Sequence, residues 1–148
     1  MTEQASGRCF CGAMRFRFDH APLAVRSCWC RDCQYLACGN ASVNAFFRRA
    51  GLSMEGAPAV YVSHAASGNT MRRSFCPHCG THLFSEAEAR PETVVVRVGT
   101  LDDREVGRPA SIIWTGSAPG WAELDPAVPH CEGQPAIPPV PPSPSAAG

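Results

Sequence analysis

The spacing of the cysteines constrains this chain more than any other feature of its sequence. Nine cysteines occur in 148 residues, and seven of them fall into three short groups. The clearest group is Cys76-Pro77-His78-Cys79-Gly80, because two sulfurs separated by two residues can reach one metal ion from a tight turn. Gly80 can adopt a positive φ there, which lets backbone amides approach the sulfurs. Metal binding is therefore expected to supply part of the stability of the fold.

A second pair lies near the start of the chain, in Cys9-Phe10-Cys11-Gly12. Residues two apart on an extended segment point the same way, so both sulfurs can face one ion. With Cys76 and Cys79 this pair would complete a tetrahedral four-thiolate zinc site with Zn–S distances of about 2.3 Å. Four sulfurs fill the coordination shell of zinc. The site is therefore predicted to be structural and to tie the start of the chain to its middle.

The third group is Cys28-Trp29-Cys30-Arg31-Asp32-Cys33, in which three cysteines can hold one metal ion locally. A zinc ion with three protein ligands keeps an open position, which is typical of catalytic sites. Two alternatives stay open at this point. Cys38 would close the site if it were a fourth ligand, and all seven cysteines could serve structural metal in a zinc ribbon that only mediates contacts. Cys131 is expected to be an ordinary free thiol.

Composition and charge exclude several classes of function. All 13 basic residues are arginines, so Schiff-base chemistry by a lysine amine is impossible. The formal net charge of zero argues against a nucleic-acid partner or an acidic membrane surface. No apolar run is long enough to span a membrane, and the first residues lack a secretion signal. We therefore expect a cytoplasmic protein whose cysteines stay reduced and form no disulfides.

The chain divides into three parts on composition. Residues 1–6 are predicted to be a flexible arm, and residues 7–132 the metal-binding domain. Residues 133–148 hold many prolines and are expected to form a disordered tail. The chain length suits one domain between these ends.

Short apolar segments within the domain favour strands. Met14, Phe16 and Phe18 alternate with polar residues, and the β-branched run 93–98 is predicted to be a central strand. Further strands are predicted at 59–62, 70–75 and 111–114. A short helix is expected over 31–37, closed by Gly39, and one helical turn over 86–90. We expect a mainly β, mainly antiparallel domain.

Three segments of this chain resemble the glutathione-dependent formaldehyde-activating enzymes, which share a domain with the centromere protein V group. The resemblance is carried by Gly7-Arg8-Cys9-Phe10-Cys11-Gly12-Ala13, Cys28-Trp29-Cys30-Arg31-Asp32-Cys33-Gln34 and Phe75-Cys76-Pro77-His78-Cys79-Gly80-Thr81. The stretch 98–103 and the segment around Trp121 are also similar to the family. The resemblance spans roughly residues 7–125.

The resemblance implies a fold, two zinc ions and an activity. The fold is Mss4-like, built of several coiled antiparallel β-sheets with zinc knuckles. The activity is that of a carbon–sulfur lyase run in reverse, joining glutathione or a similar small thiol to a small aldehyde. For glutathione and formaldehyde the product is S-hydroxymethylglutathione, a step in formaldehyde detoxification. The implied ligands are Cys9, Cys11, Cys76 and Cys79 for structural zinc, and Cys28, Cys30 and Cys33 for catalytic zinc.

The sequence departs from the family pattern in two places. Trp29 stands where the family often has histidine, and Cys38 stands where a small residue is common. Arg31 is a candidate for binding a glutathione carboxylate, because an arginine fork matches a carboxylate. Asp32 is a candidate proton relay. Because sites vary on a shared fold, two further functions stay open: a lyase acting on another thiol adduct, and a non-catalytic zinc domain that carries glutathione or binds a protein partner.

Overall fold

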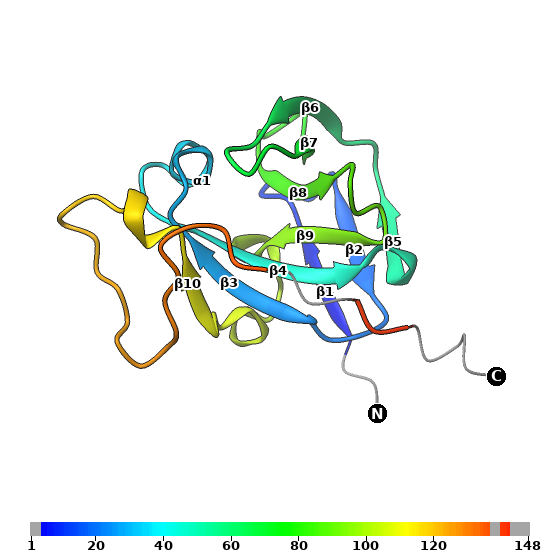
Figure 1. Ribbon diagram of the computed structural model, residues 1–148. Helices are drawn as coiled ribbons and strands as arrows, with labels where there is room; N and C mark the ends of the chain where they lie inside the picture. The colour runs from blue at the N-terminus through cyan, green and yellow to red at the C-terminus, as the bar shows by residue number, and fades with distance from the viewer. Residues whose placement is uncertain (1–3, 137–139, 143–148) are drawn as a thin grey trace.

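The computed structural model describes residues 4–136 and 140–142. This part of the chain forms ten strands, one short α-helix and four 3-10 helices (Figure 1). The strands make two sheets, and each strand pair is antiparallel except that of β10 with β3. The protein is therefore mainly β, as the sequence predicts. No helix in the described residues is both long and apolar enough to cross a membrane.

The smaller sheet has three strands in the order β1 (Ala5–Arg8), β2 (Arg15–Phe18) and β5 (Leu52–Glu55). The larger sheet has seven, in the order β10 (Ser111–Ile113), β3 (Ala24–Cys28), β4 (Ser42–Arg48), β9 (Thr93–Arg97), β8 (His82–Ala87), β7 (Thr70–Phe75) and β6 (Ala59–His64). The helices are α1 (Arg31–Leu36) and the 3-10 segments η1 (Arg49–Gly51), η2 (Val98–Thr100), η3 (Arg104–Gly107) and η4 (Thr115–Ser117).

The main hydrophobic core brings side chains of β2 together with the middle strands of the larger sheet. The predicted alternation is confirmed in β2, where Phe16 and Phe18 are buried and the two arginines are exposed. Phe18 stacks on Phe47 of β4 with ring centroids 3.9 Å apart, and Phe16 meets Phe84 of β8 edge to face at 5.1 Å. Close contacts of this kind fix how the two sheets pack.

The predicted central strand is confirmed as β9, which lies between β4 and β8. The helix at α1 is confirmed as well, and it closes as expected: Gly39 has a φ of 96°, and its amide donates to the carbonyl of Gln34 at 2.7 Å. The helical turn expected over 86–90 is wrong. Strand β8 continues to Ala87, which pairs with Met71 of β7, because cross-strand pairing outweighs the helix propensity of this short segment.

Both ends of the domain make defined contacts where the structure describes them. Ala5 and Ser6, inside the segment expected to be an arm, belong to β1, and Ala5 is buried. In the proline-rich segment, the Nε of Arg48 donates to the carbonyl of Pro141 at 2.9 Å. The rest of the predicted tail, residues 137–139 and 143–148, lies outside the described residues. The domain boundaries themselves stay a prediction.

Candidate metal centres

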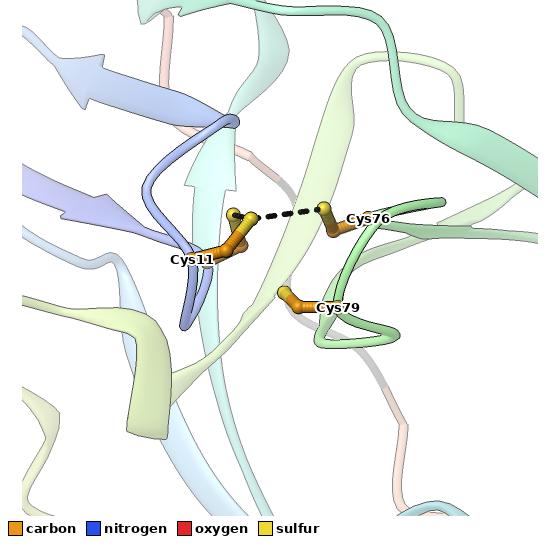
Figure 2. Close-up of side chains that lie close together, drawn as sticks. Cys11, Cys76 and Cys79 are labelled. Atoms are coloured by element: carbon orange, nitrogen blue, oxygen red, sulfur yellow. Dashed lines mark hydrogen bonds between the residues drawn. The ribbon is translucent and has the colours of Figure 1, made fainter.

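Four cysteines from two distant parts of the chain meet beside the main core. Cys9 and Cys11 lie in the loop after β1, and Cys76 and Cys79 lie in the turn between β7 and β8. Their four sulfurs all lie within 4.8 Å of one another. Figure 2 shows the side chains of Cys11, Cys76 and Cys79 pointing toward one another from these two loops. We call this group the quartet.

Two glycines allow the loops of the quartet to turn tightly. Gly12 has a φ of 82° and Gly80 a φ of 77°, a region that residues with a Cβ seldom adopt. Each loop closes with a backbone hydrogen bond: Gly12 donates to the carbonyl of Cys9 at 3.1 Å and Gly80 to that of Cys76 at 2.8 Å. The positive φ predicted for Gly80 is confirmed.

The distances in the quartet suit a tetrahedral thiolate site. With Zn–S bonds of about 2.3 Å, the edges of the tetrahedron are about 3.8 Å long. The sulfur of Cys11 lies 3.6 Å from that of Cys9 and 3.8 Å from that of Cys76. The amide of Met14 donates to the Cys9 sulfur at 3.2 Å, an interaction that favours a thiolate. The geometry of the quartet therefore fits a metal ion coordinated by four cysteine sulfurs.

The hydroxyl of Thr81 also prepares the quartet for a metal. It lies 3.1 Å from the sulfur of Cys79 and accepts a hydrogen bond from the amide of Phe10 at 3.0 Å. The hydrogen bond from the Thr81 hydroxyl to the Cys79 sulfur, together with hydrogen bonds from backbone amides, lowers the pKa of Cys79 to about 5. Cys79 is therefore ready to bind as a thiolate at neutral pH.

The remaining three clustered cysteines form a second group, which we call the trio. Cys28 ends β3, Cys30 caps the N-terminus of α1, and Cys33 lies within that helix. Their sulfurs lie within 4.8 Å of one another. The amide of Cys33 donates to the sulfur of Cys30 at 3.4 Å, so the first turn of α1 holds two of the three sulfurs in place.

In the described residues, no further cysteine, histidine or carboxylate joins the trio. Cys38 is exposed, adopts a φ of 57° just beyond α1, and does not belong to the group. Cys131 packs against the same small apolar cluster as Cys28 and Cys33, but it is not one of the three. All nine cysteines are free of disulfides. The alternative in which Cys38 closes the site therefore has no support from the geometry.

A polar network from β4, β8 and β9 surrounds the sulfur of Cys33. The side-chain amide of Asn44 contacts this sulfur at 3.8 Å, and Asn44 accepts a hydrogen bond from Arg97. Arg97 also donates to the hydroxyl of Ser85 at 2.6 Å. Hydrogen bonds from Cys28 and Cys30, and then the positive charge of Arg97, lower the pKa of Cys33 to about 2 although burial opposes them. Cys33 is thus the cysteine of the trio at which the thiolate form is favoured.

A cavity of about 700 Å³ lies between α1 and the strands β6, β7 and β8. Asp32 of α1 and Arg73 of β7 face it and form an ion pair at 3.2 Å. Arg73 is almost fully buried, whereas the neighbouring Arg72 is exposed, so only one of these two arginines faces the cavity. The rest of the lining is mostly aromatic or apolar: Tyr35, Leu36, Tyr61, Ser63, His64, Phe75, Gly80 and His82.

Two residues singled out from the sequence lie away from this lining. Arg31 is exposed, donates to the side chain of Gln34 at 2.6 Å, and lies over the ring of Tyr35. Its role toward glutathione stays a prediction. Trp29 is buried and packs edge to face against Trp121 with centroids 6.1 Å apart. Trp29 is therefore a buried residue that does not line the cavity.

Sequence reasoning missed the most unusual polar residue near the trio. Arg97 ends the apolar strand 93–97, where every preceding residue is valine or threonine. A lone arginine at the end of such a run is a signal, because a buried guanidinium needs an anionic partner. The lining of the cavity as a whole was also missed, since it combines α1 with the strands β6, β7 and β8, which follow much later in the chain.

Comparison with known proteins identifies the family. The family model described as glutathione-dependent formaldehyde-activating enzyme matches residues 4–117. The chain belongs to this family. Both cysteine groups lie inside the matched segment, whereas Trp121 lies outside it. Membership supports a function related to glutathione and formaldehyde, and the family is associated with zinc.

A solved structure resembles the fold as well. The crystal structure of a Rhodobacter sphaeroides protein, determined as a structural genomics target, aligns with a TM-score of 0.53 and 23% sequence identity. The match covers 70% of this chain and 96% of that protein. At this identity the likeness supports the fold alone. No curated protein matches the chain.

Proposed function

We propose that this protein is a zinc-dependent carbon–sulfur lyase-type enzyme that joins a small thiol to a small aldehyde, with glutathione and formaldehyde as substrates. One observation carries the proposal: the trio has three sulfurs and no fourth protein ligand among the described residues, whereas the quartet has four. A three-ligand zinc site can accept a substrate atom, and a four-ligand site cannot.

In this proposal the quartet holds structural zinc and the trio holds catalytic zinc. The sulfurs of Cys9, Cys11, Cys76 and Cys79 would supply all four ligands of one ion, and those of Cys28, Cys30 and Cys33 would supply three ligands of another, since within each group the sulfurs lie within 4.8 Å of one another. When bound at the trio, zinc would supply positive charge that favours the deprotonated form of an incoming thiol. All donors are thiols, which suits zinc among the divalent ions of a reducing compartment.

The cavity beside α1 supplies room for the body of the thiol. Its volume of about 700 Å³ falls in the range typical of small-molecule sites and is far more than a one-carbon aldehyde requires. Asp32 lies between two trio cysteines in sequence and faces the cavity, so the cavity and the trio share α1. The Asp32–Arg73 pair offers one negative and one positive group, which match the ammonium and carboxylate of a γ-glutamyl end.

The reaction needs a proton carrier, and His82 of the cavity lining is suited to that role. Burial, and then the charges of Arg97 and Arg73, lower the pKa of His82. The imidazole is therefore neutral at neutral pH and can accept a proton. In the forward direction the thiol proton passes to His82, the sulfur forms a bond to the aldehyde carbon, and His82 returns the proton to the aldehyde oxygen. No atom is left over, since thiol and aldehyde add without a leaving group.

Exchange NMR of a mixture of glutathione and formaldehyde tests the proposal. We expect the zinc-loaded protein to speed interconversion of free and adduct forms beyond the uncatalysed rate. Cys30→Ser should abolish the acceleration, lose one zinc and stay folded. Cys38→Ser, which changes an exposed cysteine outside both groups, should retain the wild-type rate. An unchanged exchange rate with fully loaded wild-type protein would remove formaldehyde as substrate, even if the protein bound glutathione as a carrier.

A further inference from the structure

Arg97 is placed unusually for an arginine. It lies on β9 in the middle of the larger sheet, and none of the ion pairs in the described residues includes it. Its guanidinium donates to the side chains of Asn44 and Ser85. Its Nε is inaccessible to water and has no hydrogen-bond partner among the described residues. A guanidinium held in this way needs a nearby anion to offset the cost of desolvation.

The sulfurs of the trio supply that anion. Burial and the positive charge of Arg73 lower the pKa of Arg97, whereas negative charge at Cys33 and Cys28 raises it. Asn44 also links the two groups, because it accepts from Arg97 and contacts the Cys33 sulfur at 3.8 Å. Arginine stays protonated in proteins, so its positive charge at this place is permanent.

Arg97 changes the net charge of the trio and its bound metal ion. Three thiolates and one divalent ion carry a net charge of minus one. Arg97 brings the centre to zero, because Arg73 is already neutralised by Asp32 at 3.2 Å. A neutral guest at the open position leaves the centre at zero, whereas an anionic guest makes it minus one. Without Arg97 the same anionic guest would make it minus two.

We infer that Arg97 determines the class of ligand that the trio accepts, by favouring an anionic guest such as a thiolate over a neutral one such as water or imidazole. This inference rests on the proposed function in one respect, namely that the trio holds a divalent metal ion. Arg97 is a positioning residue for charge and does not itself touch the reacting atoms. Asn44 holds its guanidinium beside the ligand sulfur.

The test uses Co²⁺ as a spectroscopic probe in the full chain. The Co²⁺ spectrum of Cys30→Ser, which keeps only the quartet, is subtracted from that of each protein with an intact trio. Thiocyanate, a permanent anion, and imidazole, a neutral ligand, are then titrated separately at constant, mildly alkaline pH. Both ligands bind without losing a proton under these conditions, so the measured affinities do not include the free energy of deprotonating a thiol.

We expect Arg97→Gln to weaken thiocyanate binding by about 10- to 100-fold and to change imidazole binding by less than about threefold. One opposite charge in contact with a site shifts a charged equilibrium by about one to two powers of ten. Arg97→Lys should restore most of the preference, because the charge returns. Arg72→Gln removes the same charge from an exposed position on β7 and should change neither affinity.

A second variant keeps the test decisive if Arg97→Gln fails to fold. Asn44→Asp is nearly isosteric and places a negative charge between Arg97 and the Cys33 sulfur, so it should weaken thiocyanate binding while Arg97 stays in place. Equal changes in thiocyanate and imidazole affinity in either folded variant would overturn the inference. Absence of any trio Co²⁺ spectrum in the wild-type protein would instead overturn the proposed metal site.

Discussion

Replacing one cysteine in each of the two candidate metal centres should affect stability very differently. Cys76→Ser and Cys28→Ser form a matched pair, because both cysteines are buried and each lies where a strand ends: Cys28 is the last residue of β3, and Cys76 directly follows β7. Each change swaps a buried sulfur for a hydroxyl, so the cost of that swap largely cancels in the comparison. What differs is the length of chain that each centre cross-links.

A metal ion bound by the quartet would cross-link segments far apart in sequence. Cys11 and Cys76 are separated by 65 residues, so constraining that loop stabilises the fold by about 4 kcal/mol on the loop-entropy scale used for disulfides. The trio spans only Cys28 to Cys33, for which the same scale gives about 2 kcal/mol. At about 2–4 °C per kcal/mol for a chain of this size, Tm should fall by about 8–16 °C for Cys76→Ser and about 4–8 °C for Cys28→Ser.

Differential scanning calorimetry of the purified variants, with zinc counted in the same samples, measures both quantities. Each variant should retain about one zinc ion, and urea denaturation should rank the free energies of unfolding in the same order as Tm. Equal losses of stability in the two variants would refute the reasoning. So would a Cys76→Ser protein that had lost one zinc ion yet melted at the wild-type temperature.

Three further outcomes are expected. Thr81→Val removes the hydroxyl hydrogen bond that favours the Cys79 thiolate, so the thiol pKa rises and protons should displace zinc at a higher pH, as a zinc-release titration would record. Arg73→Met should lower kcat/KM for glutathione by about 10- to 100-fold through loss of a charged hydrogen bond, whereas Arg72→Met should leave it unchanged. Phe47→Ala should cost about 3–5 kcal/mol of unfolding free energy in urea, because its ring is fully buried.

The cysteine groups could be predicted from sequence because the spacing of ligands on a knuckle is a local property. Gly80 follows Cys79 directly, and its positive φ is a requirement of that one turn. The same holds for β2, where Phe16 and Phe18 alternate with arginines, and for the helix at α1, which ends before Gly39. In each case the residues that decide the structure are within a few positions of one another.

Contacts between distant segments could not be predicted in the same way where no cysteine pair marks them. The sequence 86–90 resembles a helical turn when taken alone, but Ala87 pairs with Met71 in the sheet. Likewise, nothing near Arg97 in sequence reveals that Asn44 will hold its guanidinium beside the trio. The register of β4 on β9, which pairs these two residues directly, creates that contact.

The two centres differ in their surroundings as well as in ligand number, and this difference bears on function. Cys9 and Cys76 belong to the main core together with Phe16 and Phe84, so the quartet cannot change without disturbing the packing of both sheets. The trio belongs to a small separate cluster with Ile113. A centre whose ligand shell changes during each turnover should be isolated from the main core, since close-packed interiors transmit strain. Under the proposed function, the fold would place the complete ligand shell within the main core and the incomplete one in a smaller cluster, where a guest could enter and leave.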